Sequence, residues 1–185
     1  MKYLFSFLLS TALLAQTPIV DGSKLTPTMG PSIQRGPGWT NALKNLLPSR
    51  SFHGNSLSFI MTFVAPTGDC NIEDSMDIPM GWKSYQFEVP ARQTVTFKLD
   101  TEYKSNFRLF TVNRWGDLEE GMLQNTIYKG EPKASYISPK DTPNKIYLVI
   151  ASDDFTPGEK YTLEVRYMVN KSFYRKIQRP SNRAF

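Results

Sequence analysis

The feature that most constrains this fold is an alternation of apolar and polar side chains, which begins near residue 56 and recurs up to residue 169. Clear examples are residues 85–89, 95–99, 145–152 and 160–169. Successive side chains of a strand point to opposite faces, so a period of two predicts strands with one buried face. About eight such segments, separated by Pro, Gly and Asp turns with no helical stretch between them, predict an all-β, antiparallel β-sandwich or jelly-roll-like fold.

The order of these segments also suggests which strands are joined by tight turns. Residues 85–89 and 95–99 flank a short turn at Pro90 and are expected to form a hairpin. A second hairpin turn is expected at Asp153 and Asp154.

The first 15 residues place Lys2 ahead of a short apolar run that ends at the small residue Ala15. This order is typical of a secretory signal peptide, and the mature chain is expected to start near Gln16. The run is too short to span a bilayer, which needs about 20 apolar residues. We therefore expect an exported protein that is periplasmic, extracellular or at the cell surface.

Composition divides the rest of the chain into three parts. Residues 16–50 are rich in Pro and Gly, which predicts an extended arm, with one short amphipathic helix near residues 40–47. Residues 51–169 are expected to form the β-sandwich domain, and residues 170–185 a basic C-terminal tail.

Charge is distributed unevenly over these parts. Residues 51–169 carry 12 basic and 16 acidic side chains, whereas residues 170–185 carry five basic side chains and no acidic one. The five are Lys171, Arg175, Lys176, Arg179 and Arg183. An acidic body and basic arms attract one another, which favours association with another envelope or secreted protein, or self-association through the arms. An anionic envelope surface or polysaccharide is a further candidate partner for the tail, and no nucleic acid is expected for an exported protein.

Residues 85–97 read as an aromatic-rich strand, a Pro-Ala turn and a Thr-Val strand, and residues 158–165 read Gly-x-x-Tyr-x-Leu-x-Val. In this order they resemble the bacterial pre-peptidase C-terminal domain, over roughly residues 82–169, with Arg92 in place of the usual glycine. The resemblance implies a jelly-roll-like sandwich in the secretory space, usually a non-catalytic module attached to a secreted enzyme or surface protein. The acidic Asn-Asp motif that often precedes the first strands of that family has no recognisable counterpart here.

The sequence offers little for catalysis. Cys70 is the only cysteine and His53 the only histidine, and neither lies in a nucleophile-elbow or cysteine-protease motif. Carboxylates are plentiful, so a small secreted hydrolase using carboxylates or His53 stays open as an alternative.

Two sets of residues are candidates for binding. Hard oxygen ligands for Ca²⁺ crowd one stretch, which is expected to be a loop: Asp69, Asn71, Glu73, Asp74 and Asp77. Aromatic side chains near expected strand ends could stack on sugars, as in a carbohydrate-binding module: Trp82, Tyr103, Trp115 and Tyr128. The leading hypothesis is a non-catalytic secreted module that binds or assembles through its sandwich and its basic arms.

Overall fold

The computed structural model describes residues 16–33, 58–77, 82–101, 107–115, 122–127, 133–138, 141–152 and 157–169. These residues form eleven strands and one 3-10 turn. The elements are β1 (Ile19–Asp21), η1 (Gly22–Lys24), β2 (Pro27–Ile33), β3 (Ser58–Val64), β4 (Cys70–Met76), β5 (Trp82–Val89), β6 (Gln93–Thr101), β7 (Phe107–Val112), β8 (Met122–Ile127), β9 (Lys133–Ile137), β10 (Asn144–Ser152) and β11 (Glu159–Val169). Within these ranges no helix has the length and apolar character that crossing a bilayer requires.

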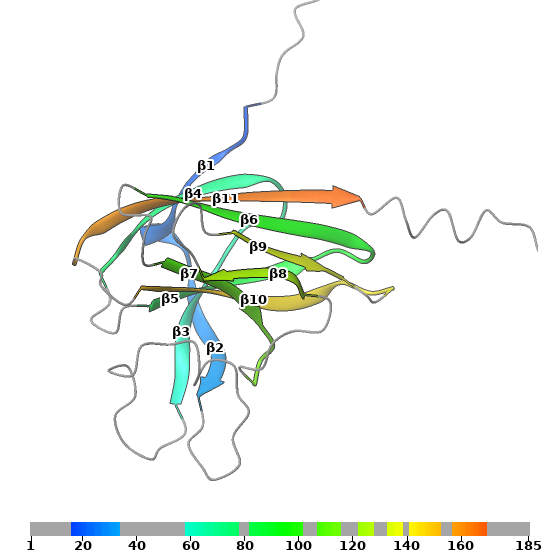
Figure 1. Ribbon diagram of the computed structural model, residues 1–185, viewed down its shortest axis with the longest axis horizontal. Helices are drawn as coiled ribbons and strands as arrows, with labels where there is room; N and C mark the ends of the chain where they lie inside the picture. Colours follow the sequence, from blue (N-terminus) through cyan, green and yellow to red (C-terminus); the bar gives the residue numbers. More distant parts are fainter. Residues whose placement is uncertain are drawn as a thin grey trace, which may run out of the picture.

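The strands form two sheets that share one strand. The order is β1-β4-β11-β6-β9-β8-β7-β10-β5-β3-β2. We call β1, β4, β11, β6 and β9 sheet A, and β7, β10, β5, β3 and β2 sheet B. Strand β8 pairs with β9 on one side and with β7 on the other, so it joins the two sheets. In Figure 1 the strands of sheet A lie above those of β7, β10 and β5.

The two sheets bury one apolar core between them, as the alternation predicts. Sheet A contributes Ile72, Phe97 and Leu163, and sheet B contributes Phe87 and Leu148, each at most 1% exposed. The rings of Phe87 and Phe97 lie 4.8 Å apart at their centroids and therefore join the two layers directly. The expected all-β sandwich is confirmed.

Strand pairing differs from the expectation in two respects. The sandwich is mixed rather than wholly antiparallel, because β1 pairs with β4, and β3 with β5, in parallel. The two expected hairpins are also absent: β5 pairs with β10 and β3, whereas β6 pairs with β11 and β9. The turn at Pro90 therefore carries the chain from one sheet to the other, and so does the connection from β10 to β11. Alternation reports which side chains are buried but not which strand lies alongside.

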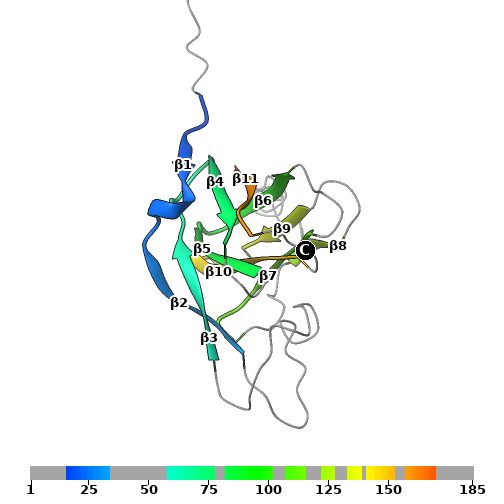
Figure 2. The ribbon, with the colours of Figure 1, turned by 90° about the vertical axis from the view of Figure 1, so that its left-hand side faces the viewer.

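The expected extended arm is wrong for residues 19–33. These residues form β1, η1 and β2, which we call the N-terminal clasp. Strand β1 pairs with β4 at the edge of sheet A, and β2 pairs with β3 at the edge of sheet B. Figure 2 shows both strands along one side of the molecule. The domain boundary expected at residue 51 must therefore move toward the N-terminus, since the clasp completes both sheets.

Three further expectations fall outside the described residues. They are the signal peptide at 1–15, the short helix near 40–47 and the basic tail at 170–185.

Candidate functional site

A row of polar side chains crosses the outer face of sheet A. Asp21 of β1 is in register with Glu73 of β4, which is in register with Thr162 of β11, which in turn faces Asp100 of β6. Neighbouring strands lie about 4.8 Å apart, so the Cα atoms of Glu73 and Asp100 lie roughly 10 Å from one another across Thr162. Both acids are exposed. The register thus gathers three carboxylates from distant parts of the chain on one face.

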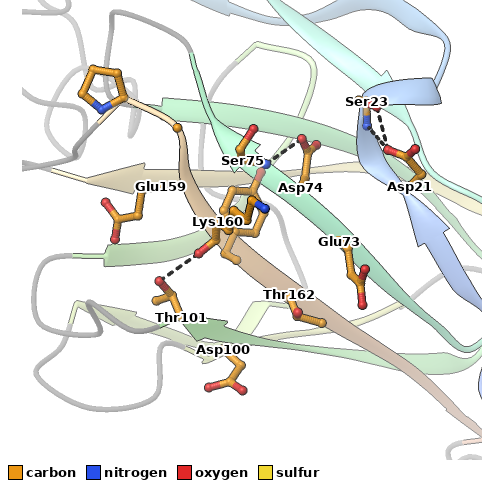
Figure 3. A pocket seen from close by; sticks show the side chains of 13 residues that line it. Asp21, Ser23, Glu73, Asp74, Ser75, Asp100, Thr101, Glu159, Lys160 and Thr162 are labelled. Atoms are coloured by element: carbon orange, nitrogen blue, oxygen red, sulfur yellow. Dashed lines mark hydrogen bonds between the residues drawn. The ribbon is translucent and has the colours of Figure 1, made fainter.

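This row lines a groove of about 850 Å³ at one end of β11. Figure 3 shows the groove with Thr162 between Glu73 and Asp100, and with Asp21 and Ser23 of the clasp at its rim. The acidic lining residues are Asp21, Glu73, Asp74, Asp100 and Glu159, against the single base Lys160. We call this hollow the acidic groove.

Local interactions fix the clasp at the groove rim. Asp21 caps η1 by accepting hydrogen bonds from the backbone N–H and the hydroxyl of Ser23, at 3.1 and 2.6 Å. It also pairs with Lys24 at 2.8 Å. The bonds from Lys24 and then Ser23 lower the pKa of Asp21 to about 2. Asp21 therefore carries its negative charge throughout the physiological pH range.

Beneath the groove lies a buried polar network centred on Asp74. The Asp74 carboxylate pairs with Lys83 Nζ at 2.6 Å, and both side chains are almost fully buried. Its second oxygen accepts from the Tyr85 hydroxyl at 2.6 Å, and Tyr85 in turn lies 2.6 Å from the Tyr161 hydroxyl. Burial raises the pKa of both tyrosines well above its usual range, so both stay protonated. Because Tyr85 gives its proton to Asp74, Tyr161 donates to Tyr85.

The clasp packs directly against this network at Gly22. A Cβ added to Gly22 would lie 2.2 Å from Asp74 Oδ2, far inside van der Waals contact. Only glycine lets η1 approach the carboxylate so closely. The network therefore fixes the end of β4, and through Gly22 it also fixes the clasp.

The stretch expected to be a loop with calcium ligands is largely a strand, because residues 70–76 form β4. In a strand, alternate side chains diverge, and most of the proposed ligands have separate partners. Asp69 accepts from the Tyr167 amide at 2.7 Å, Asn71 accepts from Arg166 at 3.1 Å, and Asp77 accepts from the Ser75 hydroxyl. Within the described part of the chain, no three His, Cys, Asp or Glu side chains are grouped as metal ligands would be.

The single cysteine lies inside the sandwich. Cys70 is 1% exposed in the core of the sandwich. Burial raises the pKa of its thiol to about 11, which is the opposite of the activation that a catalytic thiolate needs. His53, the residue named for the hydrolase alternative, lies outside the described residues.

Only one of the four aromatic candidates is seen at the surface. Trp115 is 58% exposed, whereas Trp82 is 5% exposed, so Trp82 belongs to the packed interior and its assignment as a sugar platform is wrong. Tyr103 and Tyr128 lie outside the described residues, as do Lys171, Arg175, Lys176, Arg179 and Arg183 of the tail.

Sequence reasoning missed the acidic groove because its members are far apart in the chain. Glu73 was singled out as a metal ligand, while Asp21 and Asp100 were not singled out at all. The sequence signal that could have found it is the alternate spacing of the apolar residues Cys70, Ile72 and Met76. This spacing is typical of a strand, in which Glu73 lies on the opposite face.

Comparisons with known proteins give distant structural likenesses, among them the two described below. No family model matches the sequence, and no curated protein matches it. The pre-peptidase C-terminal domain of a collagenase from Bacillus anthracis is similar, with 16% identity over 59% of this chain and 96% of that chain, at a TM-score of 0.40. PliG from Aeromonas hydrophila, a periplasmic inhibitor of g-type lysozyme, is similar with 16% identity over 58% and 96%, at a TM-score of 0.36. The first is the class of domain that residues 85–97 and 158–165 resemble. At these values the likenesses assign neither a family nor a function, and the sandwich architecture rests on the strand pairing of this chain.

Proposed function

We propose that this chain is an exported, non-catalytic binding module, and that its acidic groove takes up an extended basic segment of a protein. The observation that carries the proposal is the row Asp21, Glu73 and Asp100, which presents three carboxylates from three strands on one outer face. A groove on a sheet face suits an extended chain, whose lysine and arginine side chains would reach the carboxylates.

The basic segment with the best match in charge is residues 170–185 of a second copy. It carries five basic side chains and no acid, and it follows directly on β11, which lines the groove at its opposite end. Glu159–Val169 spans roughly 33 Å at about 3.3 Å per residue, so β11 ends far from the groove of its own copy. Pairing between copies would bring tail and groove together.

The experiment measures association of the full-length protein by sedimentation velocity at rising salt. Glu73→Gln in the groove should weaken self-association roughly threefold at low salt, as expected for one exposed charge pair. Glu88→Gln removes an exposed acid from sheet B and is the matched control. Replacing the five basic tail residues by Gln should abolish the salt-dependent association.

Two results would separate the parts of this proposal. Equal effects of Glu73→Gln and Glu88→Gln would rule out the groove as the binding face. If Glu73→Gln weakens binding of an added basic peptide but not self-association through the tail, the groove remains a binding site and the tail is rejected as its occupant.

The hydrolase alternative rests on the same carboxylates. Inverting glycosidases hold their two carboxyl groups roughly 6.5–9.5 Å apart, and the strands that carry Glu73 and Asp100 lie roughly 10 Å apart across β11. Both are exposed on the sheet, so water has free access to them. Hydrolysis of a glycan by the full-length protein that is lost in Glu73→Gln would favour the enzyme over the binding module.

A further inference from the structure

A second hollow lies on the outer face of sheet B, far from the acidic groove in the strand order. Its volume is about 320 Å³, and it is lined by Met29, Gly30, Gln86, Arg114, Lys145 and Tyr147. That volume is at the small end of the range for ligand pockets, about 300–1,000 Å³, and suits one compact chemical unit.

Strand register explains how these residues meet. Tyr147 of β10 faces Gln86 of β5 on one side and Val112 of β7 on the other. Strand β7 runs antiparallel to β10. Arg114 follows Val112 by two residues and therefore lies level with Lys145, which precedes Tyr147 by two. The backbone of Arg114 is held by β2, whose Ser32 N–H donates to the Arg114 carbonyl at 2.9 Å. Strand β2 therefore reaches across sheet B and forms one wall of the hollow.

Close packing of β2 on β3 depends on Gly30. A Cβ at this position would lie 2.7 Å from the carbonyl oxygen of Ile60. The neighbouring Met29 remains 64% exposed and gives the hollow an apolar rim.

The hollow holds two positive charges without an acidic partner. Arg114 and Lys145 are exposed, and neither forms an ion pair with another described residue. The nearest acid by register is Glu88, which faces Lys145 across the strands, yet no ion pair joins them. Two adjacent cations repel each other, and a bound anion would relieve that repulsion.

The remaining groups suit a ring that carries hydroxyls. Gln86 offers an amide and Tyr147 a phenol hydroxyl. Burial raises the pKa of the Tyr147 hydroxyl, and the nearby charge of Arg114 partly opposes that rise. Trp115 follows Arg114 in the chain and is 58% exposed, and the Arg114 guanidinium lies 5.9 Å from its ring centre. The turn that presents Trp115 is fixed by its N–H, which donates to Asn113 Oδ1 at 2.8 Å.

We propose that this hollow binds a carboxylated sugar unit of an acidic polysaccharide. The carboxylate lies between Arg114 and Lys145, the hydroxyls bond to Gln86 and Tyr147, and the sugar ring packs against Trp115. An acidic peptide would satisfy the two cations, but its Asp and Glu side chains carry no ring that could pack against the exposed indole. This site is independent of the acidic groove on sheet A.

The test is calorimetric titration of the full-length protein with oligogalacturonate and, as a second carboxylated glycan, a hyaluronate oligomer. Fully methyl-esterified oligogalacturonate has the same rings without the charge and is the matched control ligand. We expect binding of a carboxylated glycan, at least about tenfold weaker in Arg114→Gln or Lys145→Gln, since each removes a charge-assisted hydrogen bond. Trp115→Ala should weaken binding about fivefold or more, and Trp115→Phe less. Glu88→Gln should strengthen binding because it removes the opposing charge.

Lys133→Gln removes one exposed cation from sheet A, outside both hollows, and is the control variant. Binding that falls equally in Lys133→Gln and Lys145→Gln would show a general charge effect and overturn the site. Equal binding of the ester and the acid would overturn the role of the two cations. Binding of polyglutamate without binding of either glycan would assign the hollow to an acidic protein segment and reject the sugar. A failure of the binding function proposed for the acidic groove would leave these glycan-binding results unchanged.

Discussion

Removal of the buried ammonium at Lys83 should destabilise the whole sandwich. The Lys83 and Asp74 side chains are only 7% and 2% exposed, and their charged atoms are 2.6 Å apart. In Lys83→Met the side-chain stem is replaced by one of similar size, so apolar packing is largely kept. The Asp74 carboxylate would then retain only the Tyr85 hydroxyl and the Ser75 N–H as partners.

The size of the effect follows from the desolvation of the remaining charge. Breaking a buried ion pair by removing one partner costs about 3–5 kcal/mol, because an uncompensated charge stays buried. Lys83 Nζ also lies 4.9 Å from the centre of the Phe63 ring, and losing this contact adds roughly 0.5–1 kcal/mol. Total stabilities of about 5–15 kcal/mol are usual, so the variant would lose a large fraction of its free energy of unfolding.

Urea unfolding measured by tryptophan fluorescence provides the assay, because Trp82 is buried beside Lys83. The double variant Lys83→Met, Asp74→Leu should recover most of the lost stability, since replacing a whole buried pair by apolar groups is often neutral. Tyr85→Phe alone should cost about 1–2 kcal/mol, the value of a hydrogen bond to a charged group. A loss below about 1 kcal/mol in Lys83→Met, typical of a surface pair, would refute this account of the network.

Three further outcomes are expected. Gly22→Ala should loosen the clasp, because the added methyl group would clash with the Asp74 carboxylate. Hydrogen exchange at the β4 amides should then become faster. Unchanged exchange would mean that η1 has room to shift. Cys70 should resist thiol reagents at pH 8 in the folded protein and react once urea unfolds it, because burial raises the pKa of its thiol to about 11. Labelling of the folded protein would contradict the position of Cys70 in the core. The Asp21 carboxyl should titrate near pH 2 by NMR, so that its stabilising bonds persist above the ordinary aspartate pKa and are lost as pH falls toward 2. Lys24→Gln should raise that midpoint, and an ordinary midpoint in the unmodified protein would exclude the described cap.

The sequence predicted the elements of this fold better than their partners. Alternation at residues 85–89 and 145–152 identified β5 and β10, and it predicted the apolar core between the sheets. It could not predict that β5 and β6 belong to different sheets, because a period of two is the same whichever strand lies alongside. The charged outer residues of β4 favour an acidic loop in the sequence, and Pro27 and Pro31 of β2 favour an extended arm. Prolines are tolerated there because β2 is an edge strand.

The candidate sites depend on long-range register and were therefore the least accessible to sequence reasoning. Asp21 and Asp100 are 79 residues apart, and only the pairing of β1, β4, β11 and β6 brings them to one face. Trp115 was identified as a candidate because a turn was expected there. Arg114 and Lys145 were not, since nothing local marks them as neighbours.

The clasp has a consequence for how copies of this protein meet. Residues 19–33 supply both terminal strands of the eleven-strand order, so a copy with an undocked clasp exposes the edges of β4 and β3 together. A neighbouring copy carries the one segment that fits both edges in the correct register, which makes reciprocal exchange of this segment the natural route to a swapped dimer. Partial unfolding at this seam would thus convert a closed monomer into an intertwined pair, whereas loss of the segment would leave two open edges prone to aggregation.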